Sequence, residues 1–133
     1  MCHTGVVDYP EYRLDGQAAL VTGASRGIGA DLARALANAG ARVAVAARDL
    51  PALETLAGDI AEAGGEAIAV DMDVGDIASI RRGGAAVRER FGRLDVLVNN
   101  AGLGANLPAE EVTESDWDEM MAVNLRGLFF CCQ

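Results

Sequence analysis

The sequence predicts an α/β fold in which a doubly wound parallel sheet is covered by helices. Three observations predict it: apolar runs of strand length alternate with helical segments, a glycine-rich turn follows the first run, and aromatic residues make up only 5% of the 133 residues. Strands of a parallel sheet are buried on both faces and therefore read as continuous apolar runs. The chain is long enough to build the core of one domain.

The first strand and the turn after it are the most informative stretch. The apolar run 18–21 leads into a turn from Gly23 to Gly29 with the spacing G-x-x-x-G-x-G, and then into a helix that ends near Gly40. Three apolar residues recur at i, i+4 and i+8, as on one helical face: Ile28, Leu32 and Leu36. Glycines let the backbone approach a diphosphate, and a helix start directs free N–H groups and a positive dipole end toward it. Glycines also serve tight turns and close helix packing, so the pattern needs support from the rest of the chain.

Three more strands are predicted from short apolar runs, at residues 43–47, 66–70 and 94–98. Helical segments separate them, which gives the order β-α-β-α-β-α-β of a doubly wound sheet. Polar residues follow two of these strands, because Asp73 lies shortly after residue 70 and Asn99-Asn100-Ala101-Gly102 follows residue 98. Ligands of open α/β sheets bind at the carboxyl ends of strands, so these residues are candidates for a binding site.

Each of the two middle helices is preceded by an aspartate suited to cap it. Asp49 stands shortly before Pro51, as an N-cap before a first-turn proline does, and Asp76 precedes the next helix. The predicted apolar positions are Leu53, Leu56, Ala57 and Ile60 in the first helix, and Ile77, Ile80, Gly84, Val87 and Phe91 in the second. The pair Gly83-Gly84 costs about 1 kcal/mol per glycine relative to alanine, which predicts fraying or unusually close packing there.

The last segment is predicted to be one helix. Thr113-Glu114-Ser115-Asp116 resembles a capping box with aspartate in place of glutamate. Five residues recur at intervals of 4, 3, 4 and 3 and make a single stripe: Trp117, Met121, Asn124, Leu128 and Cys131. Asn124 is the polar member, and an amide on an apolar face costs about 1–3 kcal/mol unless it is hydrogen-bonded. A structural amide that bridges to the backbone would meet this need as well as a functional one.

Composition excludes several functions. The formal charge is −9 and no lysine or basic cluster is present, which argues against nucleic acid as a partner. No apolar run reaches membrane-spanning length. The cysteines, Cys2 and the adjacent Cys131-Cys132, have neither a metal-ligand nor a disulfide spacing, so we predict no metal site and a reducing, cytoplasmic setting. Residues 1–13 read as a polar leader without a signal-peptide pattern, and His3 is better explained as part of that tail than as a ligand or catalyst.

Three motifs in this order resemble those of the short-chain dehydrogenase/reductase family: Thr22-Gly23-Ala24-Ser25-Arg26-Gly27-Ile28-Gly29, Asp73-Val74 and Asn99-Asn100-Ala101-Gly102. The likeness covers residues 14–133 and corresponds to the N-terminal half of such a protein, most similar to the 3-oxoacyl-carrier-protein reductase type. The resemblance implies a Rossmann-type sheet that is truncated after the fourth strand and the following helix. It also implies an oxidoreductase that transfers a hydride between nicotinamide and a carbonyl or secondary alcohol substrate.

The resemblance assigns roles to the motif residues. The turn would hold the pyrophosphate and adenosine ribose, Asp73 would accept a hydrogen bond from the adenine amino group, and Asn100 would lie beside the nicotinamide ribose. Asp73 is alternatively an aspartate that caps a turn, and Asn99 is expected to stabilise the sheet by bridging strand ends. Asn124 would help to hold a water that relays protons to the catalytic lysine. The predicted cofactor-binding residues are Gly23, Ser25, Arg26, Gly27, Ile28, Gly29, Arg48, Asp73, Val74, Asn100, Ala101 and Gly102.

The choice of cofactor is predicted from the end of the second strand. An NAD site usually places an acid there to bond the ribose 2′-hydroxyl, but this sequence has Ala47 followed by Arg48. Together with Arg26 in the glycine turn, Arg48 would bind a 2′-phosphate through charge-assisted hydrogen bonds. Asp49 would favour NAD if it were the strand-end acid, but it fits better as a helix N-cap. We therefore predict NADP(H).

The family's catalytic serine and its Tyr-x-x-x-Lys are expected after Gln133, because the sequence has no lysine and both tyrosines precede the first strand. Two classes of function compete for that reason. The chain is either the cofactor-binding part of a carbonyl reductase or alcohol dehydrogenase, or a non-catalytic nucleotide-binding or assembly module. A methyltransferase is disfavoured because it would need an acid where Ala47 and Arg48 stand. The uncovered fourth strand and final helix predict a homo-oligomer.

Overall fold

The computed structural model describes residues 12–104 and 106–133 and contains a four-stranded parallel sheet with the order β3-β2-β1-β4. The predicted doubly wound α/β fold is therefore confirmed. The strands are β1 (Ala18–Thr22), β2 (Arg42–Ala47), β3 (Glu66–Asp71) and β4 (Val96–Val98). The predicted leader lies almost entirely outside the described residues, as do Cys2 and His3.

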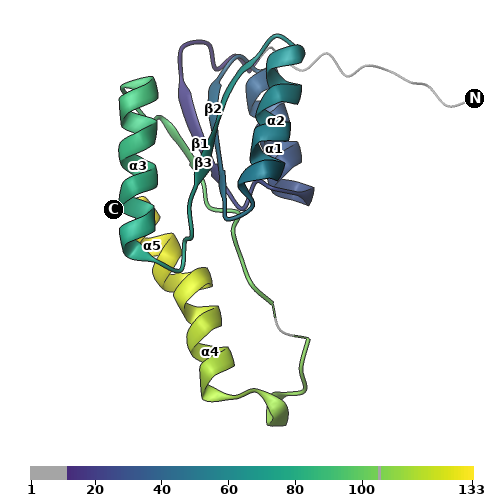
Figure 1. Cartoon of the computed structure of the whole chain (residues 1–133), viewed down its shortest axis with the longest axis vertical. Coiled ribbons are helices and arrows are strands. Elements are labelled where there is room, and N and C mark those ends of the chain that lie inside the picture. Colours follow the sequence, from purple (N-terminus) through teal and green to yellow (C-terminus); the bar gives the residue numbers. More distant parts are fainter. Residues whose placement is uncertain (1–11, 105) are drawn as a thin grey trace, which may run out of the picture.

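Helices cover both faces of this sheet (Figure 1). On one face lie α1 (Gly27–Asn38) and α2 (Leu50–Glu62), and on the other lies α3 (Ile77–Phe91), beside α5 (Leu128–Cys132). Each layer has its own apolar core, because β1 and β2 send alternate side chains to opposite faces. The central position of β1 places all five of its residues inside the protein.

The order of the strands creates a site at one edge of the sheet. β1 pairs with β2 on one side and with β4 on the other, so the direction of the chain's winding reverses at β1. Open α/β sheets bind ligands at the carboxyl ends of the strands beside such a reversal. The glycine-rich turn after β1 and the polar segment after β4 both lie at this edge.

The buried face of α1 differs from the prediction. Alanines face the sheet, whereas Ile28 is 73% exposed and Leu32 is 38% exposed. The small Ala30, Ala33 and Ala37 let the helix lie close to the strands. Of the predicted stripe, Leu36 is half-buried and packs against the core, so the prediction was wrong for Ile28 and Leu32. The exposed Ile28 is instead available to the cleft described below.

The predicted caps of the middle helices are confirmed. The Asp49 carboxylate accepts a hydrogen bond from the Ala52 amide at the start of α2, and the Asp76 carboxylate accepts one from the Ala78 amide at the start of α3. For the glycine pair in α3, the sequence predicted either fraying or close packing, and close packing is found. Gly83 is buried, and a Cβ there would lie 3.3 Å from Val70 Cγ1, whereas Gly84, which was predicted for the apolar face, is exposed.

β4 begins later than predicted, at Val96 rather than at residue 94. Asp95 explains the difference, because its carboxylate accepts a hydrogen bond of 2.9 Å from the Ala18 amide and also pairs with Arg93. The hydrogen bond from Arg93, and secondarily the one from Ala18, holds the pKa of the Asp95 carboxyl below its usual value. The chain ahead of β4 is thus tied to β1 by the Asp95 side chain and by the hydrogen bond from the Asp95 amide to the Ala18 carbonyl oxygen, and β4 itself has only three residues.

The last helical segment is continuous but not uniform. After the 3₁₀ turn η1 (Ala109–Glu111), it consists of α4 (Glu114–Met121), the π-helix η2 (Ala122–Gly127) and α5. The predicted capping box is present, with Thr113 and Asp116 each accepting a hydrogen bond from the other's backbone amide. α4 extends away from the sheet in Figure 1, and none of its residues is buried.

Candidate functional site

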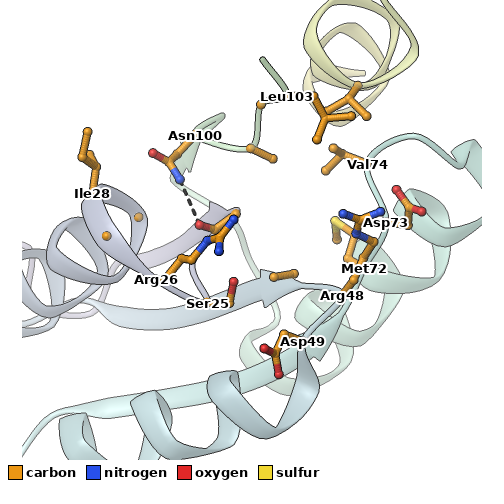
Figure 2. Close-up of a pocket in the computed structure, with 17 residues that line it drawn as sticks. Ser25, Arg26, Ile28, Arg48, Asp49, Met72, Asp73, Val74, Asn100 and Leu103 are labelled. Atoms are coloured by element: carbon orange, nitrogen blue, oxygen red, sulfur yellow. Dashed lines mark hydrogen bonds between the residues drawn. The ribbon is translucent and has the colours of Figure 1, made fainter. Parts of the chain in front are cut away.

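A cleft of about 840 Å³ lies at the carboxyl ends of the strands (Figure 2). It is built by the glycine-rich turn after β1, the end of β2, the loop after β3 and the segment after β4, with one residue from η2. All twelve residues that the sequence predicts for cofactor binding line it. The further lining residues, which the sequence analysis did not assign to the site, are Ala47, Asp49, Met72, Leu103 and Val123.

The glycine-rich turn is shaped for close approach of a ligand. Gly23 has a φ of +65°, and a Cβ at this position would lie 2.7 Å from Ala101 Cα. Gly27 has a φ of +57° and has open space where a Cβ would stand. The residue before α1, Arg26, makes no side-chain cap, so the N–H groups of the first turn remain available to an anion.

Thr22 and Asn100 join the ends of β1 and β4. The buried Thr22 Oγ1 accepts hydrogen bonds from the amides of Asn100 and Ala101 at 3.2 and 3.1 Å, and the Asn100 side chain donates to the carbonyl oxygens of Thr22 and Gly23, both at 3.0 Å. The sequence analysis gave this bridging role to Asn99, and that was wrong. The Asn99 amide donates instead to Cys132 Sγ in α5. The sequence feature that could have identified Thr22 as a bridging residue is its place, as a threonine, at the end of a buried strand.

Asp73 both caps a turn and faces the cleft. Its Oδ1 accepts a hydrogen bond of 2.8 Å from the Gly75 amide, and its own amide donates to Ser79 Oγ at 3.0 Å. Within residues 12–104 and 106–133, Oδ2 has no hydrogen-bond partner. The alternative of a turn-capping aspartate is therefore realised, and it leaves one carboxylate oxygen free to accept from a ligand.

Two charged residues follow each other at the end of β2: Arg48, and Asp49, whose carboxylate caps α2. Asp49 Oδ1 accepts from the Ala52 amide at 3.2 Å, which fixes this carboxylate at the start of α2. Arg48 and Arg26 are exposed, and neither makes an ion pair or hydrogen bond with any described residue. Figure 2 shows the two guanidinium groups reaching toward the cleft from the turn and from the end of β2, without touching each other.

Asn124 does not line the cleft itself. Its exposed side chain exchanges two hydrogen bonds with the backbone of Leu103, which does line the cleft. The amide on the predicted stripe is thus satisfied by backbone, as the structural alternative required. Asn124 acts on the cleft through Leu103.

Two features are absent from the described residues, a metal-binding cluster and a membrane-spanning helix. Residues 12–104 and 106–133 hold no group of three or more histidine, cysteine or acidic side chains placed to bind a metal ion. Of the helices in the described part of the chain, none combines the length and apolar character that a membrane span requires.

A parallel sheet of this winding with a glycine-lined cleft at the reversal of strand order defines a dinucleotide-binding type of α/β protein. The chain belongs to the short chain dehydrogenase family, because the family model matches residues 17–133. Among curated relatives, D-threitol dehydrogenase from Mycolicibacterium smegmatis is 45% identical over 127 residues, which are 96% of this chain and 48% of the relative. The chain thus spans about half the length of the curated relatives it matches.

Solved structures of the family superpose closely on the described fold. A metagenomic short-chain oxidoreductase in complex with NADP is 44% identical, with a TM-score of 0.84 over 89% of this chain and 54% of that one. A 3-ketoacyl-(acyl-carrier-protein) reductase from Brucella melitensis, complexed with NADH, is 38% identical, with a TM-score of 0.84 over 90% of this chain and 48% of that one. Structures of this family therefore include complexes with either dinucleotide.

Proposed function

We propose that this chain is the cofactor-binding part of an NADP(H)-dependent oxidoreductase that acts on a carbonyl or secondary alcohol substrate. The observation that carries the choice of cofactor is the end of β2, where Arg48 faces the cleft and the Asp49 carboxylate is already bound to the Ala52 amide. An acid that caps a helix is poorly placed to hold a ribose 2′-hydroxyl, and two unpaired guanidinium groups favour a 2′-phosphate.

The residues of the cleft suit the other parts of a dinucleotide. The open N–H groups at the start of α1 and the turn from Gly23 to Gly29 would bind the diphosphate. The free Oδ2 of Asp73 would accept a hydrogen bond from the adenine amino group, with Val74 packed nearby. The nicotinamide, when bound, supplies or accepts the hydride, and Asn100, Ala101 and Gly102 would line the cleft beside its ribose.

For catalysis, we propose that Asn124 contributes by holding a water, although it does not line the cleft. Its Oδ1 accepts one hydrogen bond from the Leu103 amide and retains a second lone pair, which is open to a water that would relay protons. The chain has no lysine, and both of its tyrosines precede β1, so the proton donor of the family is not available from these 133 residues. We therefore expect no carbonyl-dependent NADPH oxidation by this chain alone. Turnover that survives purification and is lost in Asn124→Ala would contradict this expectation.

The cofactor is tested by titrating the chain with NADPH and NADH and repeating both titrations with Arg48→Asp. The substitution replaces a cation with an anion beside the expected 2′-phosphate, so NADPH binding should weaken by tenfold or more, on the order of 1.4 kcal/mol, while NADH binding changes little. Arg81→Asp is the matched control, because Arg81 is exposed on α3, unpaired among the described residues and outside the cleft. Equal losses for both dinucleotides would reject the assignment.

The second candidate is a non-catalytic nucleotide-binding or assembly module. The absence of lysine favours it for this chain, and so does the apolar surface of its last helix, formed by the exposed Trp117, Leu125, Leu128 and Phe129. It shares the cleft and the dinucleotide with the first candidate, so activity rather than binding separates them. We place either version in the cytoplasm, as the spacing of the cysteines suggests.

A further inference from the structure

The π-helix η2 contacts both loops that close the cleft. On one side, Asn124 is hydrogen-bonded to Leu103 in the segment after β4. On the other side, Arg126 Nη2 donates to the Gly75 carbonyl oxygen at 3.2 Å in the loop after β3. η2 thus reaches from the end of the cleft proposed for nicotinamide to the end proposed for adenine.

Gly127 lies against the backbone of the loop after β3. It is the one buried residue between Glu114 and Cys132. A Cβ at this position would stand 3.0 Å from the carbonyl carbon of Val74 and would collide with the Val74 carbonyl oxygen. Both opposing atoms are backbone, so no side-chain rotation relieves the contact, and either the helix or the loop must move.

The loop that Gly127 touches carries three residues that line the cleft, Met72, Asp73 and Val74. The carboxylate of Asp73 is tied to the same loop, because its Oδ1 accepts the hydrogen bond from the Gly75 amide. Movement of Val74 and Gly75 therefore also moves the free oxygen of Asp73 within the cleft.

We propose that Gly127 is a positioning residue for the dinucleotide. Its missing side chain sets the separation between η2 and the loop after β3, and thereby the places of Asp73 and Val74 at the adenine end of the cleft. Arg126 spans the same separation through its hydrogen bond to the Gly75 carbonyl oxygen. This inference rests on the proposed function, because it assigns a position within the proposed dinucleotide site.

The test is calorimetric titration of the chain and of Gly127→Ala with NADPH, NADH and ADP, which carries the adenine end alone. The substitution should weaken the better dinucleotide and ADP by the same factor of about ten, because the displaced groups face the adenine. Gly84→Ala is the matched control, a glycine-to-alanine change in a helix with open space around the new methyl group, and it should leave every dissociation constant unchanged. A purely structural glycine would lower Tm in Gly127→Ala and leave the dissociation constants of the folded protein unchanged, which would overturn the proposal.

Arg126 provides a second test that adds no bulk to the contact. Arg126→Met removes the hydrogen bond to Gly75 and should weaken ADP binding, and Arg126→Lys should restore part of it.

Loss of dinucleotide binding with unchanged ADP binding in Gly127→Ala would place the defect elsewhere in the cleft and refute the proposal. A wild-type chain that binds neither dinucleotide would refute the proposed function and this inference together, whereas normal wild-type binding with normal Gly127→Ala binding would refute the inference alone.

Discussion

Asn124 and Leu103 exchange two hydrogen bonds of 2.7 Å, from the Leu103 amide to Asn124 Oδ1 and from Asn124 Nδ2 to the Leu103 carbonyl oxygen. The pairing is the one that a backbone strand would make, supplied here by a side chain from η2. It holds the segment after β4 against the last helix and so fixes one wall of the cleft. An amide side chain supplies the donor and the acceptor of this contact from two separate atoms, Nδ2 and Oδ1.

Asn124→Asp should therefore destabilise the protein. The carboxylate still accepts from the Leu103 amide, but it cannot donate to the Leu103 carbonyl oxygen. Its second oxygen therefore faces that carbonyl oxygen, and two hydrogen-bond acceptors repel each other. We expect the free energy of unfolding to fall by about 1 kcal/mol, since the site is exposed to water that partly replaces the lost bond. Urea denaturation measures it, with Asn106→Asp as a control that makes the same change of charge at an exposed loop position. Equal free energies for the two variants would contradict the role given to this amide.

Thr22→Val tests the junction of β1 and β4. Valine keeps the shape of the side chain but removes the oxygen that accepts from the Ala101 amide, which has no other partner among the described residues. The Asn100 amide retains a second bond to the Val98 carbonyl, so the expected loss is about 2 kcal/mol for one orphaned N–H group and the missing hydroxyl bonds. Thr55→Val, at an exposed position in α2, removes a hydroxyl that bonds only the Pro51 carbonyl and should cost much less. Similar losses at the two positions would argue against a special role for Thr22.

The features that the sequence predicted correctly are local ones. The aspartate caps of α2 and α3 and the box at the start of α4 join residues within three positions of each other, so composition and spacing suffice to find them. The strands of the sheet centre were found for a related reason, since burial on both faces requires an unbroken apolar run. The three motifs of the cleft came from the resemblance to the short-chain dehydrogenase/reductase family, and the carboxyl ends of those strands agreed with it.

The features that were missed depend on contacts between distant segments. Two adjacent amides, Asn99 and Asn100, look alike in the sequence, and only the path of the chain after β4 decides which one reaches β1. A periodic pattern of 3.6 residues does not reveal the π-helix that begins at Ala122. The need for glycine at position 127 comes from Val74, a residue of another segment. The alanine face of α1 depends on how closely that helix approaches the sheet.

The Asp95 carboxylate should make stability depend on pH. Its pKa is lowered in the folded state, so its contribution is present above the unfolded value of about 3.9 and is lost as the pH falls through the folded value. Asp95→Asn keeps an acceptor for the Ala18 amide but loses the charge opposite Arg93, and it should unfold more easily at pH 7. Between about pH 5 and about pH 2, the range in which the linkage relation places the effect, its free energy of unfolding should also fall less than that of the wild type. Urea denaturation at each pH measures the difference.

Asp118→Asn is the control for this series, because the Asp118 side chain has no hydrogen bond or ion pair among the described residues. It should follow the wild-type curve from neutral to acidic pH. Parallel curves for Asp95→Asn and the wild type would show that the contact with Arg93 and Ala18 does not contribute to the folded state.

The last prediction concerns the apolar surface of the last helix. Trp117 is 55% exposed, Leu125 62%, Leu128 43% and Phe129 61%. α4 has no buried residue, and its main neighbour among the described elements is η2. If about 400 Å² of this apolar surface were covered, the gain would be on the order of 10 kcal/mol before the costs of association are subtracted. That is comparable to the entire stability of an ordinary domain.

We therefore expect the chain to form a dimer or a larger assembly through this surface at micromolar concentration, as measured by light scattering during size-exclusion chromatography. The short edge of β4, only three residues long, offers little pairing of its own, so the helix should dominate. Phe129→Glu should shift the protein toward the monomer because it places a charge within this apolar surface. Tyr12→Glu makes the same kind of change at a side chain that is 78% exposed and far along the chain from the helix, and it should leave the assembly intact. A monodisperse wild-type monomer with a sharp thermal transition would show that the exposed helix is stable without a covering partner.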